Sequence, residues 1–197
     1  MASARPCSLA LRPALLTAAL VIAALQPGRA TAAQIGPIRI ALHDGGYDVA
    51  FDAVVEAPRD RVFAILSDYA HLARINPQIT SSSSRRSPTG AGERVRTVLH
   101  SCIWVFCKNL VQIEDVRARG SNTLIARIIP GGGDFSGGTS LWHLERDGAA
   151  TRLHYEATRK LTAWLPPFIG TAVVKHTLRA QFRATINALE RLARRKH

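Results

Sequence analysis

The feature that most constrains the fold is a series of strand-like segments joined by turns too short to hold a helix. The segments are residues 79–86, 93–102, 107–117, 123–129, 135–146 and 150–162. In the last two, apolar and polar residues alternate, which is typical of strands with one buried face, and Asp147-Gly148 between them is a hairpin signal. Because parallel strands need a long crossover, these segments predict an antiparallel sheet.

Helices are predicted on both sides of this series. Residues 47–56 alternate as a first strand, and Pro58 with Asp60 favours a helix start after it. A second short helix, 69–74, ends before a proline. The long segment 168–195 has an apolar stripe at spacings of three and four, formed by Leu178, Phe182, Ile186, Leu189 and Ala193. The order predicts an α+β domain whose helices cover one face of a curved sheet and leave room for a ligand.

The N-terminus is typical of a secretory signal peptide. Arg5 and Arg12 precede an apolar run at 14–25, and small residues follow up to Ala33. The run is shorter than the roughly 20 residues of a membrane span, although retention as an uncleaved anchor is the alternative. We therefore expect residues 1–33 to be a signal peptide that is cleaved.

The rest of the chain has the length of one domain. Removing 33 of 197 residues leaves 164, which we divide into a lead-in at 34–46 and a single domain at 47–197, located in the periplasm or outside the cell. The net charge is +12, and about +9 without the three arginines of residues 1–33. In an exported protein this charge favours contact with a membrane surface through the basic end of the last helix, and we expect no nucleic-acid partner.

Two segments resemble START-like helix-grip proteins of the SRPBCC superfamily. VVEAPRDRVFAILSDYAHLARINPQI is similar to the family's opening, and LPPFIGTAVVKHTLRAQFRATINALERLA to its closing helix. The matching positions of the opening are Ala57, Pro58, Val62, Phe63, Leu66, Asp68, Tyr69, Leu72 and Pro77. The resemblance covers about 47–195 and is strongest to the polyketide cyclase/dehydrase branch, which includes coenzyme Q-binding START proteins. It implies a curved antiparallel sheet wrapped around a long C-terminal helix, in β-α-α-β6-α order.

Such a fold implies a hydrophobic cavity. We expect a binding or carrier protein for a hydrophobic small molecule such as a lipid, a quinone or a polyketide-like compound. The side chains predicted to line its cavity are Phe63, Tyr69, Ile75, Leu99, Trp142, Tyr155, Trp164, Phe168 and His176.

Catalysis is the alternative reading, because the same superfamily includes cyclases and fold does not fix activity. The sequence has no G-x-S-x-G or H-E-x-x-H motif, and the PGGGDFSGG segment lacks the lysine of a phosphate loop and predicts a glycine bulge instead. The acid–base candidates Tyr69, Tyr155, Arg159 and His176 form no recognisable triad. A cyclase or dehydratase therefore remains the second hypothesis, and we predict neither a metal nor a cofactor.

In the helix-grip frame, Cys102 and Cys107 lie where two long strands meet, facing each other across a four-residue turn at 103–106. Facing positions of an antiparallel pair are close enough for a disulfide, which is our prediction. Free thiols and a metal site are the alternatives, but C-x4-C is not a usual zinc spacing. Export to an oxidising compartment favours the disulfide.

Overall fold

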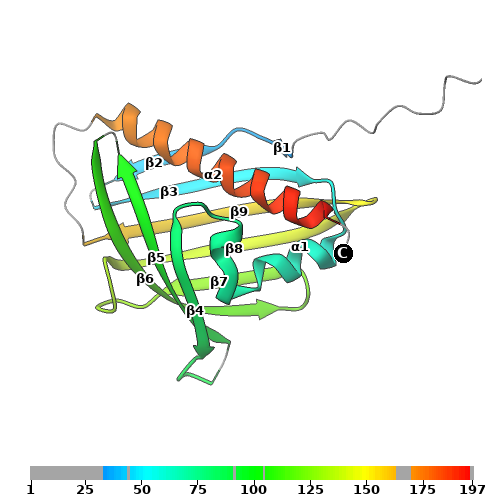
Figure 1. The fold of residues 1–197 in the computed structure, drawn as a ribbon, viewed down its shortest axis with the longest axis horizontal. Helices are drawn as coiled ribbons and strands as arrows, with labels where there is room; N and C mark the ends of the chain where they lie inside the picture. Colours follow the sequence, from blue (N-terminus) through cyan, green and yellow to red (C-terminus); the bar gives the residue numbers. More distant parts are fainter. Residues whose placement is uncertain (1–32, 44, 91, 104, 163–169, 196–197) are drawn as a thin grey trace, which may run out of the picture. The chain divides into compact units, whose positions relative to one another are not determined.

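The protein is built on one curved antiparallel sheet, seen in a computed structural model that describes residues 33–195 except 44, 91, 104 and 163–169 (Figure 1). In this part of the chain the strands are β1 (Gln34–Ile35), β2 (Arg39–His43), β3 (Gly46–Val55), β4 (Ile79–Arg86), β5 (Glu93–Ile103), β6 (Phe106–Arg119), β7 (Thr123–Ile128), β8 (Phe135–Asp147) and β9 (Ala150–Leu161). Their order is β1-β3-β9-β8-β7-β6-β5-β4, and β2 also pairs with β3. The predicted antiparallel sheet and α+β helix-grip class are confirmed.

Within the described residues, three helical segments accompany the sheet: α1 (Arg59–Leu66), the 3₁₀ segment η1 (Tyr69–Arg74) and α2 (Thr171–Arg194). The helix α2 crosses in front of β2, β3 and β9 (Figure 1). Its predicted stripe enters the main core, where Ile186 and Leu189 are fully buried with Phe51 of β3. Burying one such side chain contributes roughly 1.5–3 kcal/mol, so this stripe is what fixes α2 to the sheet. None of the described helices is long and apolar enough to cross a membrane.

The C-terminal half of α2 is also held by polar contacts. Glu190 is buried, and its Oε2 accepts a hydrogen bond from the backbone N–H of Glu56, at the end of β3, at 3.3 Å. Its Oε1 accepts one from Arg194 Nη1, also at 3.3 Å. Because both oxygens of this buried carboxylate are hydrogen-bonded, Glu190 fixes the position of the helix end and stabilises it.

The observed elements follow the predicted ranges closely, with two differences. The lead-in 34–46, to which we assigned no strand, contains β1 and β2, which extend the sheet beyond β3. The predicted disulfide between Cys102 and Cys107 is present, but the four-residue turn is wrong: Ile103 pairs with Phe106, so the turn has two residues. Two-residue turns match the right-handed twist of hairpin strands, which explains the tighter connection.

The glycine bulge predicted in PGGGDFSGG is confirmed. The register of β8 against β9 shifts between Phe135 and Gly137. Gly138 then adopts a φ of 138°, and a Cβ at this position would lie 2.2 Å from the carbonyl oxygen of Thr158. Only glycine satisfies both conditions. The bulge brings β8 close to β9 beside Arg159, which belongs to the candidate site.

Candidate binding cavity

A cavity of about 180 Å³ lies between the inner face of the sheet, η1 and α2. Most of its walls are apolar, formed by Leu66, Leu72, Ile75, Ile79, Val95, Leu99, Val116, Leu124, Ala126, Trp142 and Phe182. The polar and phenolic members are Tyr47, Tyr69, Asn76, Gln78, Thr97, Gln112, Glu114, Ser140, Tyr155, Arg159, Gln181 and Thr185. An engineered apolar cavity of about 150 Å³ binds benzene, so this space accommodates one ring-sized group.

An aromatic cluster forms one wall of the cavity. The ring of Tyr155 lies 4.2 Å from that of Trp142, 5.2 Å from Phe51 and 5.6 Å from Phe182, between centroids. The rings are tilted by 43–45° to one another, between stacked and edge-to-face arrangements, and aromatic pairs contribute roughly 0.5–1.5 kcal/mol each beyond buried area. Because Tyr155 contacts rings from β3, β8 and α2, it joins the sheet and the helix at the cavity wall.

A buried ion pair forms the polar end of the cavity. Arg159 Nη2 donates to Glu114 Oε1 at 3.0 Å and to Ser140 Oγ at 3.3 Å, while Nη1 donates to the carbonyl oxygens of Thr139 and Thr158 at 2.9 and 3.1 Å. The side chains of Arg159 and Glu114 are only 8% and 13% exposed. Removing one partner of such a pair leaves an uncompensated buried charge, so the two residues act as a unit.

Sheet curvature makes this pair possible. Arg159 is on β9 and Glu114 on β6, with β8 and β7 between them. Three strand spacings of about 4.8 Å separate such positions by about 14 Å in a flat sheet. The sheet must therefore curl inward for the two side chains to meet, and the pair marks the most closed part of the inner face.

The charges in the cavity are fixed by their surroundings. Burial opposes the charge on Arg159, but attraction from Glu114, with smaller contributions from Tyr155 and Tyr47, raises the pKa of Arg159 above its usual value. Burial, with Glu93 and Glu114 nearby, raises the pKa of Tyr69 to about 12. Burial likewise raises the pKa of Tyr155. The guanidinium is thus permanently charged, and both phenols are neutral hydrogen-bond donors at physiological pH.

Glu114 Oε2 and the hydroxyl oxygens of Tyr69 and Tyr155 are among the polar atoms of the cavity that have no hydrogen-bond partner among the described residues. The side-chain nitrogens of Arg159, in contrast, already donate to four oxygens. The cavity therefore offers a ligand one carboxylate acceptor and two phenol donors, while the arginine balances the carboxylate charge.

The structure brings together five of the nine side chains predicted to line the cavity: Tyr69, Ile75, Leu99, Trp142 and Tyr155. Phe63 packs against the main core and does not line the cavity. His176 is exposed on α2 and is not a lining residue. Trp164 and Phe168 lie outside the described residues.

Sequence reasoning missed Glu114, although it considered Arg159 as an acid–base candidate. Glu114 and Asp115 are adjacent, so alternation alone does not reveal which of the two acids faces inward. The observed register settles this, because Glu114 lies opposite the buried Val95 and Asp115 opposite Arg94. The only signal in the sequence was that Arg159 continues the apolar face formed by Leu153, Tyr155 and Ala157. An arginine on this inward face needs an acidic partner.

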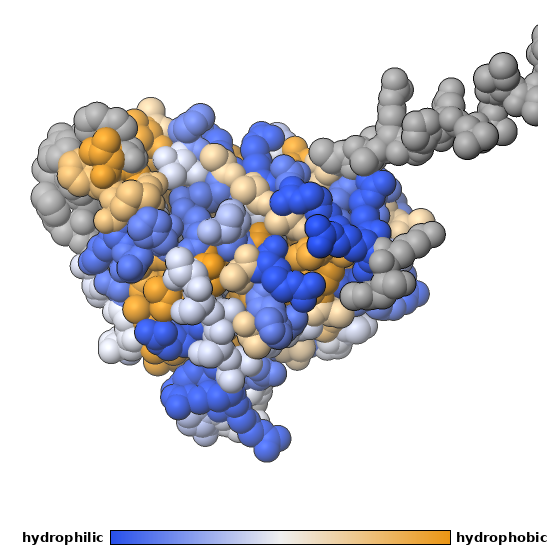
Figure 2. Space-filling view, in the orientation of Figure 1, coloured by the Kyte–Doolittle hydropathy of each residue, from blue (hydrophilic) through white to orange (hydrophobic). Residues whose placement is uncertain are grey.

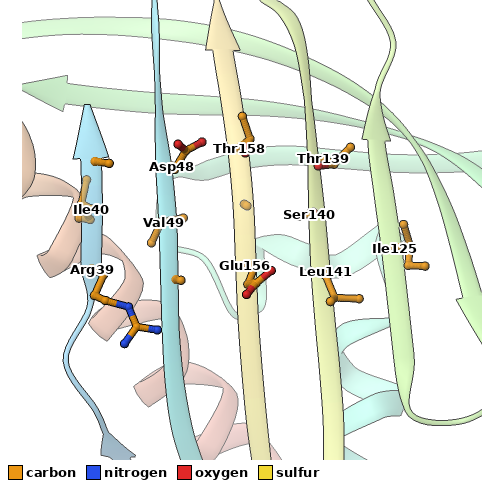
Figure 3. A pocket seen from close by; sticks show the side chains of 13 residues that line it. Arg39, Ile40, Asp48, Val49, Ile125, Thr139, Ser140, Leu141, Glu156 and Thr158 are labelled. Carbon is orange, nitrogen blue, oxygen red and sulfur yellow. The ribbon is translucent and has the colours of Figure 1, made fainter. Parts of the chain in front are cut away.

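A second, larger hollow of about 650 Å³ lies on the outer face of the sheet (Figure 3). It spreads over β2, β3, β9, β8 and β7, and its border includes the charged side chains of Arg39, Asp48 and Glu156. Asp48 and Glu156 are exposed, and the hollow has no counterpart to the buried ion pair. We therefore take the smaller inner cavity as the candidate site, because it combines enclosure with a few fixed polar groups.

The outer face also has an ionic cluster on β9. His154 Nδ1 lies 2.7 Å from Asp52 Oδ1, and its Nε2 lies 3.0 Å from Glu156 Oε1. The hydrogen bond to Asp52 is the main cause that raises the pKa of His154, and Glu156 adds to it. The two carboxylates are 61% and 57% exposed, so solvent screens this cluster strongly.

A long helix packed over a curled antiparallel sheet, with a cavity between them, defines the class of START-like helix-grip proteins. Within that class, the profile of the family described as "Polyketide cyclase / dehydrase and lipid transport" matches residues 48–194. The chain belongs to this family. A search of curated proteins found no significant match.

Solved structures agree with this assignment at the level of the fold. A START superfamily protein from Mycobacterium smegmatis is 20% identical, with a TM-score of 0.58 over 75% of this chain and 99% of that one. A conserved protein from Geobacillus kaustophilus is 12% identical, with a TM-score of 0.61 over 76% and 97%. The Zhui aromatase/cyclase from Streptomyces sp. R1128 is 17% identical, with a TM-score of 0.57 over 74% and 92%.

Proposed function

We propose that this protein is an exported carrier that binds one hydrophobic small molecule in the inner cavity. The observation that supports this most is an apolar, ring-sized space closed at one end by the Arg159–Glu114 pair. Burying apolar ligand surface contributes about 25 cal/mol per Å², and a few fixed polar groups then set the ligand's orientation.

The polar end favours a ligand that carries both a hydroxyl and a carbonyl group on or near a ring. A hydroxyl donates to Glu114 Oε2, and a carbonyl accepts from the phenols of Tyr69 or Tyr155. A second carboxylate is disfavoured, because Arg159 is already neutralised by Glu114. Polyketide-like rings that bear hydroxyl and keto groups have this pattern, whereas a quinol offers only hydroxyls, a quinone only carbonyls, and a long lipid chain would extend beyond a space of about 180 Å³.

Export is a part of the proposal that the N-terminal signal pattern supports. The Cys102–Cys107 disulfide is in keeping with it, since disulfides persist in oxidising compartments. Arg191 and Arg194 in the last turn of α2 supply the basic end that we propose to touch anionic membrane surfaces.

The first experiment is native mass spectrometry of the protein purified from the periplasm, followed by organic extraction. We expect a bound apolar compound that is released by the solvent and is missing from the variant Trp142→Ala, whose cavity wall is removed. Circular dichroism of that variant should show a folded domain. A protein that is empty, and that binds no quinol or polyketide-like ring in titration, would refute the carrier function.

A cyclase or dehydratase is the second candidate, because the cavity is not lined by carbon alone. Glu114 and Tyr69 are an acceptor and a neutral donor on the same cavity, as proton transfer requires. Incubation with a poly-β-ketone and mass spectrometry separates the two functions. Loss of one water by the wild type, abolished in Glu114→Gln, supports the enzyme; a substrate with both its mass and its chromatographic retention unchanged supports the carrier.

A further inference from the structure

The tip of the β5–β6 hairpin groups four side chains that the proposed function does not use. His100 is paired with Asn109 and Cys102 with Cys107, with the Ser101–Lys108 pair between them. His100 and Cys102 are two residues apart on β5 and therefore point to the same face of the sheet. In the described part of the chain, His100, Cys102 and Cys107 form the one group of potential metal ligands whose donor atoms all lie within 4.8 Å of one another.

The distances match the geometry of a zinc site. His100 Nε2 lies 3.5 Å from Cys102 Sγ. In a tetrahedral site, Zn–S and Zn–N bonds of about 2.3 and 2.0–2.1 Å place the nitrogen and sulfur about 3.5 Å apart. The same geometry places two zinc-bound sulfurs about 3.8 Å apart, a separation that two facing cysteines reach once their S–S bond is broken.

The histidine is already oriented for this role. Its Nδ1 lies 2.8 Å from Asn109 Oδ1, across the hairpin. When Nδ1–H donates to this oxygen, Nε2 keeps its lone pair and directs it toward the sulfur. A second-shell hydrogen bond of this kind fixes the tautomer and the ring orientation of most metal-binding histidines.

We propose that the hairpin is a redox-gated zinc site: the disulfide form does not bind Zn²⁺, and the dithiol form binds one ion through Cys102, Cys107 and His100. A dithiol reductant supplies two electrons and two protons, so that its own thiols become a disulfide, the Cys102–Cys107 bond breaks and each sulfur gains a proton. Zn²⁺ then displaces both protons and binds the two thiolates. The fourth position stays open to water.

The three ligands of the proposed zinc site are accessible from solvent and chemically suited to zinc. Cys107 and His100 are exposed and Cys102 is half-buried, so a reductant and an ion can reach them. Thiolate and imidazole are the ligands that zinc prefers. The C-x4-C spacing did not predict a site, because the third ligand is a histidine two residues before Cys102 and not part of a second cysteine pair.

The test is a zinc titration of the full chain in a Cys7→Ser background, which leaves only the hairpin cysteines. A chromogenic chelator competes for Zn²⁺ with the oxidised and with the anaerobically reduced protein. We expect one ion per reduced chain and none per oxidised chain. His100→Ala should weaken zinc binding at least tenfold, and Asn109→Ala roughly tenfold, as for other second-shell partners.

Two controls keep the result interpretable. His176→Ala removes an exposed histidine elsewhere and should leave zinc affinity unchanged, and Co²⁺ should give a thiolate charge-transfer band that Cys102→Ser/Cys107→Ser lacks. Circular dichroism checks that every variant is folded. The proposal is overturned if reduced wild type binds Zn²⁺ no more tightly than the double-serine variant, or if His100→Ala binds it as tightly as wild type.

Discussion

The strand β9 has an ionic cluster on each face, and the two differ in almost every physical respect. On the inner face, Arg159 and Glu114 are nearly enclosed, and Arg159 also donates to two backbone carbonyls. On the outer face, His154 lies between Asp52 and Glu156 in solvent. The distances within the two clusters are similar, so distance does not indicate their importance. Burial does, because charges removed from water are costly to leave unpaired.

The face of the molecule seen in Figure 2 also separates polar from apolar side chains. Figure 2 shows hydrophilic residues over much of the visible face, while apolar surface also gathers at the end where the β5–β6 hairpin and the start of α2 lie. Among the described residues, the exposed large hydrophobics Val105, Phe106 and Val173 belong to these two elements. Charged groups on the outer surface can therefore be replaced at little cost in stability, whereas the buried charges are needed for it.

The largest expected effect comes from breaking the inner pair. Arg159→Met should lower the free energy of unfolding by about 3–5 kcal/mol, because Glu114 is left as an unpaired buried charge. Urea denaturation measures the loss. In Arg159→Met/Glu114→Leu most of this stability should return. A loss no greater than that caused by His154→Ala would show that the two clusters are equivalent.

A smaller loss is expected where the bulge meets Arg159. Gly138→Ala should destabilise the protein by about 1–3 kcal/mol, because alanine is strained at a φ of 138° and its Cβ would strike the Thr158 carbonyl. Gly137→Ala is the matched control, since nothing lies within 4 Å of a Cβ there. Thermal unfolding of both variants compares them, and equal melting temperatures would contradict the role of the bulge.

The polar end can be tested without disturbing packing. Tyr155→Phe keeps the aromatic contacts with Trp142 and Phe51 and removes only the hydroxyl. We expect about a tenfold loss of affinity for a polyketide-like ring that bears a carbonyl group, the value of one hydrogen bond, with stability nearly unchanged. Isothermal titration calorimetry measures the affinity. An unaffected affinity would show that the phenol does not contact the ligand.

The outer cluster should make a small contribution to stability that depends on pH. The Asp52 hydrogen bond raises the pKa of His154 in the folded chain, so the cluster stabilises the fold below the unfolded pKa of about 6.5, and this contribution is lost as the pH rises through the folded value. Asp52→Asn should lower the pKa of His154, as followed by NMR titration. The accompanying change in stability should stay within about 1 kcal/mol, since both carboxylates are exposed. A pKa of His154 unchanged in Asp52→Asn would exclude that hydrogen bond.

Local pattern was enough to predict β3 to β9 and the helices, but not the strands β1 and β2 or the polar end of the site. Alternation identified the strands and the inward side of β9, including Tyr155, because burial on one face imposes a period of two. The Arg159–Glu114 contact joins strands that are 45 residues apart in sequence, so it depends on strand order and curvature, which alternation does not encode. At the hairpin tip, alternation places His100 and Cys102 on one face, but the positions of Cys107 and Asn109 opposite them depend on the register of the two strands.

The Arg159–Glu114 contact also links β9 directly to β6, across the two strands that lie between them. Flattening the sheet would move these two strands apart, so the sheet keeps its curvature as long as the ion pair is intact. The opposite wall is attached differently: Ser82 Oγ of β4 bonds to the backbone of Leu72 and Ala70 in η1, and Phe182 of α2 packs on Tyr155. The cavity is thus closed by a buried charge pair on one side and by neutral hydrogen bonds and ring contacts on the other.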